Sequence, residues 1–296
     1  MKRITTGLYR AEWDVVIKSI SLTPKWTPQY YHYTNAKSKT SIVNGKELDF
    51  CLSNTRDFLD RNEGIAILEP YYHACGRLYE TGKIDREFFL LARSVTPRKL
   101  RKYQGNLWVL CLTPHGCSPF MKERYAAKDG WIISFQMLAI DDFYNYFPPE
   151  CGRVRFVQMQ YSFKRMQHRL ESALSVIYKE YKKDKAAKIP NTDRELKKLL
   201  LRTVSLYSIQ YKSAEYKCEE EVRLICSISD GFSSWTYTDG EITLKTEGQG
   251  KKKTPHLILG EKYFYQATQE MKKTNDKRLN MFHIDQKTIQ RIINEK

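Results

Sequence analysis

The chain has 296 residues, of which 41% are hydrophobic and 28% charged, and this balance excludes a disordered protein. Its 50 basic and 34 acidic residues leave a formal net charge of +16, which favours a polyanionic partner. No stretch approaches the roughly 18 apolar residues of a membrane span, and the first ten residues lack the features of a secretory signal. We therefore expect a cytoplasmic protein without a membrane partner.

The cysteines and histidines predict reduced thiols and no metal site. The seven cysteines are scattered and form no Cys-x-x-Cys pair, as expected of a cytoplasmic chain. The six histidines form no His-x-x-x-His or mixed His/Cys cluster of the kind that holds zinc.

Short strands and helices are predicted in turn along the first half of the chain. The expected strands are β-branched or apolar runs, and they cover Tyr30–Thr34, Glu47–Leu52, Leu107–Leu112 and Trp131–Phe135. The expected helices cover Thr34 to about Val43, Ile67–Tyr79, Asp85–Arg93 and Phe120–Ala127.

The second half is predicted to contain two amphipathic helices between strands. A strand is expected over Arg153–Met159, which alternates with a period of two. A helix follows, whose apolar face carries Leu170, Ala173, Leu174, Ile177, Tyr178 and Tyr181. Thr192-x-x-Glu195 is a capping box that opens the next helix. A strand over Val222–Ile228, mixed loops and a helix over Asp285–Ile293 complete the prediction.

Because these strands and helices do not alternate regularly, we predict an α+β fold with a split mixed sheet. We expect one domain over residues 1–296, with a basic helical insertion over residues 165–205.

Basic residues are concentrated in two places. Between Tyr161 and Gln210 there are 12 basic and 5 acidic residues, and between Ala92 and Gln104 there are five basic residues and no acid. On the first amphipathic helix, the face opposite the apolar one carries Lys179, Lys182, Lys183 and Lys185. These lysines are predicted to bind nucleic acid; the alternative is a solvated helix face.

Three segments carry motifs in a defined order. The first holds Tyr31-His32-Tyr33-Thr34, then Leu52-Ser53-Asn54. The second holds Leu110-Cys111-Leu112-Thr113, then Tyr125-Ala126 and Gly130-Trp131-Ile132-Ile133-Ser134-Phe135. The third holds Tyr216-x-x-Glu219-x-Glu221-x-Arg223. In this order they resemble a large family of uncharacterised bacterial proteins, which we place with the ADP-ribosyltransferase superfamily.

The resemblance covers about Tyr30 to Ile228 and implies a split sheet that binds NAD in a central cleft. It implies that His32 holds the adenosine ribose or the phosphate end of NAD, and that a glutamate, Glu221 or Glu219, binds the nicotinamide ribose. The other NAD-binding residues that it implies are Tyr33, Thr34, Ser53, Thr113, Tyr125 and Arg223. The sequence departs from the family pattern where Tyr216 and Lys122 replace tryptophan and Thr113 replaces serine.

The implied reaction breaks the nicotinamide–ribose bond of NAD, and positive charge then builds on the ribose. A carboxylate beneath the ribose stabilises that charge as it develops. If the strand begins before Glu219, alternation puts Glu219 and Glu221 on one face, with Glu221 acting on NAD and Glu219 on the acceptor. The alternative for Glu-x-Glu-x-Arg is an exposed salt-bridge ladder.

Transfer of ADP-ribose to RNA or DNA is the predicted function. The resemblance implies a toxin or anti-phage role, controlled by an antitoxin protein. The alternatives are a protein-modifying transferase, an NAD glycohydrolase and a non-catalytic nucleic-acid-binding protein.

Overall fold

The protein is described here from a computed structural model and is a mixed α+β chain, as predicted; its strands form several small antiparallel sheets. The structure describes residues 7–8, 29–35, 41–44, 47–58, 60, 62–116, 118–126, 131–136, 155–228, 234–237, 242–248 and 254–260. The chain divides into two compact units. The first is built from Met1–Leu22, Asn54–Gly105 and Val157–Lys217, and the second from Thr23–Ser53, Asn106–Phe156 and Cys218–Lys296. The predicted helical insertion over residues 165–205 belongs to the first unit.

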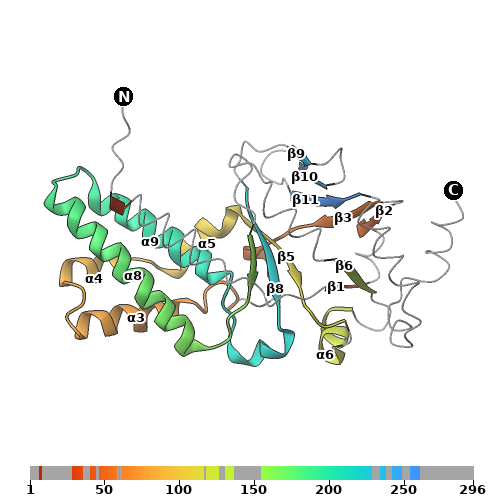
Figure 1. Ribbon diagram of the computed structural model, residues 1–296, viewed down its shortest axis with the longest axis horizontal. Coiled ribbons are helices and arrows are strands. Elements are labelled where there is room, and N and C mark those ends of the chain that lie inside the picture. Colours follow the sequence, from red (N-terminus) through yellow and green to blue (C-terminus); the bar gives the residue numbers. More distant parts are fainter. Residues whose placement is uncertain are drawn as a thin grey trace, which may run out of the picture. The chain divides into compact units, whose positions relative to one another are not determined.

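The first unit is helical (Figure 1). Its helices are α3 (Leu68–Glu80), α4 (Arg86–Ala92), α5 (Pro97–Tyr103), α8 (Phe163–Ala186) and α9 (Thr192–Ser208). Helix α8 packs against α3 and α9, and α9 also packs against α4 and α5. The short 3₁₀ helix η2 (Thr55–Asp57) opens the middle segment, and η6 (Ala214–Glu219) follows α9.

Apolar periodicity explains the core of the first unit. The predicted face of α8 is confirmed, since Leu170, Leu174, Ile177 and Tyr181 are almost completely buried. The ring of Phe88 on α4 meets the Tyr181 ring at 5.7 Å between centroids. The buried apolar faces of α3, α4, α8 and α9 therefore follow from the sequence pattern.

Two helix starts differ from the prediction. Helix α5 was not predicted, although Thr96 caps it by accepting a hydrogen bond from the Lys99 amide and Pro97 occupies its first position. The capping box at Thr192 was wrong. Asn191, with a left-handed φ of 60°, occupies the N-cap position, so Thr192 is already helical and its hydroxyl donates back to the Ile189 carbonyl.

The second unit contains the strands that position the candidate site. Strand β1 (Gln29–Thr34) pairs antiparallel with β6 (Trp131–Gln136). Strand β5 (Leu107–Leu112) pairs antiparallel with β8 (Val222–Ser227), and β4 (Ser53–Asn54) and β7 (Arg155–Gln158) complete that sheet in the order β4-β5-β8-β7. Between β5 and β6 lie α6 (Pro119–Met121) and η4 (Lys122–Ala126), a π turn, where one helix was predicted.

A five-stranded antiparallel sheet also belongs to this unit. Its order is β2 (Val43–Asn44), β3 (Glu47–Cys51), β11 (Thr254–Leu259), β10 (Ile242–Glu247) and β9 (Ser234–Tyr237). The prediction of loops after Ile228 was therefore wrong. The last three strands are short and rich in threonine, and only pairing makes their buried positions, such as Leu244 and Leu257, evident.

Two other predicted helices lie partly or wholly outside the described residues. Val43, which was expected to end a helix, lies in β2, and residues 36–40 of that helix lie outside the described residues. The helix predicted over Asp285–Ile293 also lies outside the described residues.

Candidate functional site

Strands β1 and β5 are joined by one isolated antiparallel bridge between Tyr31 and Thr113. The Tyr31 amide donates to the Thr113 carbonyl at 2.9 Å, and the Thr113 amide donates back at 3.0 Å. Away from this bridge, β1 is paired with β6, and β5 is paired with β8. Two strand pairs therefore meet at one point, and most of the predicted site residues lie around it.

His32 lies on β1 next to the bridge and contacts β5 through its ring. Its Nδ1 is 2.9 Å from the carbonyl oxygen of Cys111, and its ring packs edge-on against Phe50 at 5.6 Å between centroids. Burial lowers the pKa of His32 below its ordinary value of 6.5, and the hydrogen bond with Cys111 only partly opposes this. In the neutral ring, Nδ1–H donates to the carbonyl, so Nε2 is the acceptor atom.

This lowered pKa predicts a pH effect on stability. The unfolded chain binds a proton at His32 more readily than the folded chain, so stability should fall as the pH drops below about 6.5. Urea unfolding at pH 7 and pH 5 measures this effect. Between these two pH values, the free energy of unfolding should decrease less for His32→Gln than for the unmodified chain. An equal loss in both proteins would contradict a buried, neutral His32.

Glu221 and Arg223 form a buried ion pair at the start of β8. Arg223 Nε donates to Glu221 Oε1 at 2.6 Å, and the second contact, from a terminal nitrogen to Oε2, is 3.1 Å. Only 1% of the Arg223 side chain and 3% of the Glu221 side chain are exposed. Arg223 lies opposite Cys111 in the β5–β8 register, so this pair and His32 approach the same residue of β5. Arg223 thus holds the carboxylate of Glu221.

Glu219 is the second buried carboxylate, and it is bonded to a side chain that reaches the surface. The Tyr125 hydroxyl, on η4, donates to Glu219 Oε1 at 2.6 Å. Glu219 is 1% exposed, whereas Tyr125 is 36% exposed. The condition that the strand begins before Glu219 is not met, because η6 ends at Glu219 and β8 begins only at Val222.

Glu220 separates the two buried acids and was missed by the sequence analysis. Its φ is +41°, a left-handed conformation that is uncommon for a glutamate. This turn lets Glu219 and Glu221 both point inward while Glu220 stays exposed and binds His115 Nε2 at 2.8 Å. No sequence pattern predicts a positive φ at a glutamate. The only available sign was that Glu220 lies between the two acids that the motif selected.

The remaining predicted residues are not all brought together. Tyr33 donates its hydroxyl to the His115 carbonyl at 2.8 Å and packs in an apolar cluster with α6 and η4. Thr113 is fully buried and faces the same side as Tyr31, its bridge partner, whereas His32 faces the other side of β1. Thr34 is buried at the end of β1, and Ser53 is exposed on β4.

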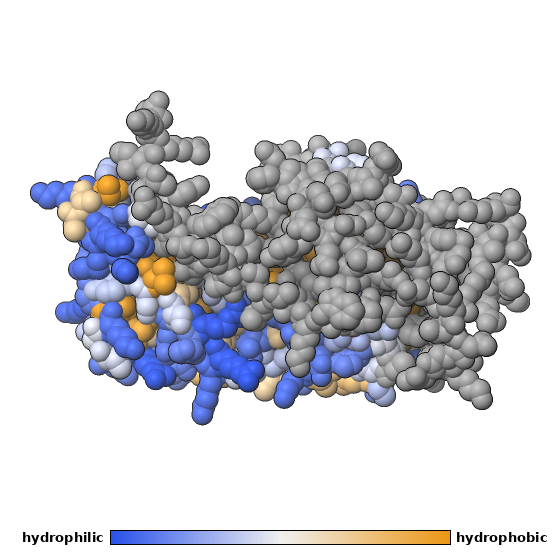
Figure 2. Space-filling model, in the orientation of Figure 1, coloured by the Kyte–Doolittle hydropathy of each residue, from blue (hydrophilic) through white to orange (hydrophobic). Residues whose placement is uncertain are grey.

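The lysines predicted to bind nucleic acid lie on α8 in the first unit, and most of them are paired with acids. Lys182 contacts Asp85 at 3.0 Å, Lys183 contacts Glu180, and Lys185 contacts Glu87 at 2.8 Å. No ion pair is found for Lys179 within the described residues. Figure 2 shows a mostly hydrophilic surface over α3, α4 and α8. These ion pairs reduce the positive charge that α8 offers to a polyanion.

The site must be interpreted from its own chemistry. No protein-family model, curated protein or solved structure matches the chain. Within the described part of the chain, no group of three or more His, Cys, Asp or Glu side chains could hold a metal ion. None of the described helices has both the length and the apolar character needed to span a bilayer.

Proposed function

We propose that the protein is an NAD-dependent ADP-ribosyltransferase whose site lies around the Tyr31–Thr113 bridge. Two observations support the proposal. A neutral imidazole on β1 is bonded to Cys111 of β5, and two buried carboxylates, Glu219 and Glu221, lie just before β8, the strand that pairs with β5. These are the groups that recognition of a ribose and stabilisation of a cationic sugar require.

The chemistry of these side chains fits NAD. The acceptor atom Nε2 of a neutral His32 suits a ribose hydroxyl better than it suits a phosphate, because a neutral ring carries no charge to pair with an anion. When bound, NAD supplies a ribose bonded to a cationic leaving group, nicotinamide, which departs with the bonding electron pair.

The two carboxylates have different environments and therefore different proposed roles. Glu221 is held at both oxygens by Arg223, so it provides a fixed charge that orients the start of β8. Glu219 is linked to the hydroxyl of Tyr125, a side chain that reaches the surface. We therefore propose that Glu219 stabilises the positive charge of the transition state and takes the proton that the acceptor loses. The acceptor forms a bond to the ribose carbon and loses its proton toward Glu219.

Nucleic acid is the proposed acceptor, because the chain carries a formal net charge of +16. Such an activity would harm the cell that makes it, so we also propose control by an antitoxin protein.

Incubation with labelled NAD and RNA, DNA or cell lysate tests this function. Label is expected in RNA or DNA. Label in the protein fraction would instead identify a protein-modifying transferase, and free ADP-ribose without labelled acceptor would identify a glycohydrolase. Intact NAD in every reaction would overturn the enzyme proposal and leave a non-catalytic binding protein.

A further inference from the structure

We propose that a basic groove between α5 and α9 of the first unit binds the phosphodiester backbone of nucleic acid. The groove has a volume of about 630 Å³, within the usual range of ligand sites. Its walls carry four basic side chains, Lys99 from α5 and Arg194, Lys197 and Lys198 from α9. The proposal shares the choice of nucleic acid with the proposed function but does not depend on ADP-ribose transfer.

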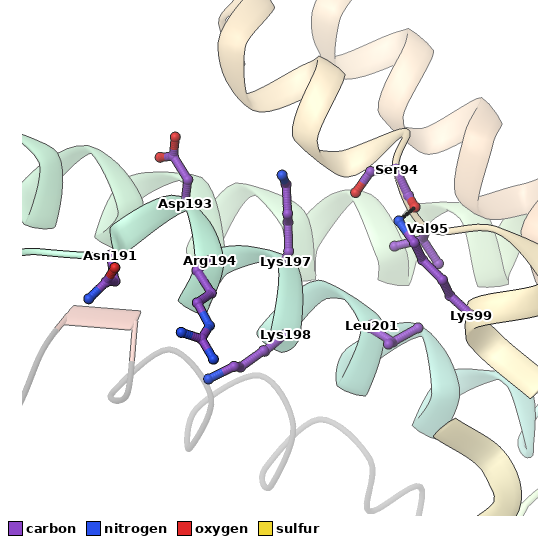
Figure 3. A pocket seen from close by; sticks show the side chains of 9 residues that line it. All are labelled: Ser94, Val95, Lys99, Asn191, Asp193, Arg194, Lys197, Lys198 and Leu201. Atoms are coloured by element: carbon purple, nitrogen blue, oxygen red, sulfur yellow. Dashed lines mark hydrogen bonds between the residues drawn. The ribbon is translucent and has the colours of Figure 1, made fainter. Parts of the chain in front are cut away.

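The spacing along α9 gathers its cations. Arg194 and Lys198 are four residues apart, so they lie one turn apart on the same face of the helix. Figure 3 shows these two extending in the same direction from α9, while Lys197, which also lines the groove, extends in the opposite direction. Lys99 approaches from α5, which packs against α9.

Arg194 and Lys197 have no acidic partner within the described residues. Lys198 contacts Glu195 at 2.7 Å, and Lys99 donates to the Ser94 carbonyl at 2.8 Å. The one acidic residue in the lining, Asp193, is already bonded to Lys185 at 3.3 Å and to the Tyr181 hydroxyl. The groove therefore keeps an excess of positive charge, in contrast to the paired lysines of α8.

The groove joins the two basic regions of the sequence. The run between Ala92 and Gln104, with five basic residues and no acid, supplies Lys99, and the helix that begins at Thr192 supplies the other three cations. Arg98 and Arg101 of the same run also lie on α5.

The composition of the lining selects the ligand. Lysine and arginine neutralise phosphates and release bound counterions, which makes binding steeply dependent on salt. None of the described lining residues is aromatic, so the groove offers no platform for stacking bases. It should therefore bind the backbone of a strand without preference for base sequence.

Fluorescence anisotropy with labelled RNA and DNA strands of about 20 nucleotides tests the groove. Arg194→Ala/Lys197→Ala should weaken binding at least about tenfold at about 100 mM salt and should lower the slope of log K against log[salt] by about 1.4 for single strands. Strands of different base sequence should bind the unmodified protein about equally.

The matched control is Lys182→Ala/Lys183→Ala, which removes the same charge from two lysines of α8 that are paired with Asp85 and Glu180, outside the groove. It should change affinity less than the groove variant, and both should retain the melting temperature and the acceptor-free NAD turnover of the unmodified protein. If the two variants weakened binding equally, net charge alone would explain the effect and the proposed groove would be wrong. No binding by the unmodified protein at about 50 mM salt would overturn it too. Displacement of the strand by equimolar inorganic phosphate would identify a site for the free ion instead.

Discussion

Glu221→Gln is expected to lower the free energy of unfolding by about 3–5 kcal/mol, the usual effect of breaking a buried ion pair. The substitution removes the negative charge that Arg223 contacts through two nitrogens, in a place where only 1% of the arginine side chain is exposed. Urea unfolding followed by circular dichroism measures the loss. A loss of activity in this variant would therefore not identify Glu221 as a catalytic residue.

Two further variants test whether the loss of stability comes from breaking the buried Glu221–Arg223 ion pair. Glu220→Gln makes the same chemical change at the adjacent residue, whose side chain is 54% exposed, and should cost no more than about 1 kcal/mol. Glu221→Leu/Arg223→Met replaces both charges with apolar groups and should recover much of the stability that Glu221→Gln loses. If Glu221→Gln were as stable as the unmodified protein, the pair would not have the buried role described here.

Glu219→Gln is expected to reduce NAD turnover by about 10²–10⁴-fold, as loss of a general acid–base group does. Glutamine keeps an oxygen that can accept the Tyr125 hydrogen bond but carries no charge, so the fold should survive. Turnover of labelled NAD and the melting temperature, measured on the same preparation, separate chemistry from folding.

Glu123→Gln is the matched control, because Glu123 lies on the same π turn as Tyr125 and is exposed. It should leave turnover unchanged. Tyr125→Phe removes the hydroxyl that orients Glu219 and should give a smaller reduction than Glu219→Gln. Full turnover in Glu219→Gln would remove Glu219 from the site, whatever the result for Tyr125.

The fold was predictable from sequence where burial is periodic. The runs Leu107–Leu112 and Trp131–Gln136 are strands, and the apolar faces of α8 and α9 are buried as predicted. Strands β9 to β11 were missed because their burial depends on pairing with residues far away in sequence. The capping box failed because a left-handed Asn191 took the N-cap position, and neighbouring residues gave no sign of this.

The candidate site was predictable in its residue types but not in its pairings. The motifs selected His32, Glu219 and Glu221, yet the contacts of Glu221 with Arg223 and of Glu219 with Tyr125 depend on the left-handed turn at Glu220. The helix pattern likewise selected the α8 lysines, but Asp85, which pairs with Lys182, and Glu87, one of the two acids that pair with Lys185, lie almost 100 residues earlier. Long-range ion pairs of this kind leave no local pattern in the sequence.

The interleaving of the two units determines which fragments of this chain can fold. Each unit takes three separate stretches of polypeptide, so the chain passes from one unit to the other at five places, near residues 22, 53, 105, 156 and 217. No single cut yields two pieces that each contain a complete unit. Expression of either unit alone would require joining three stretches with new linkers. A truncation that passes residue 22 from the N-terminus, or residue 218 from the C-terminus, would remove part of both units.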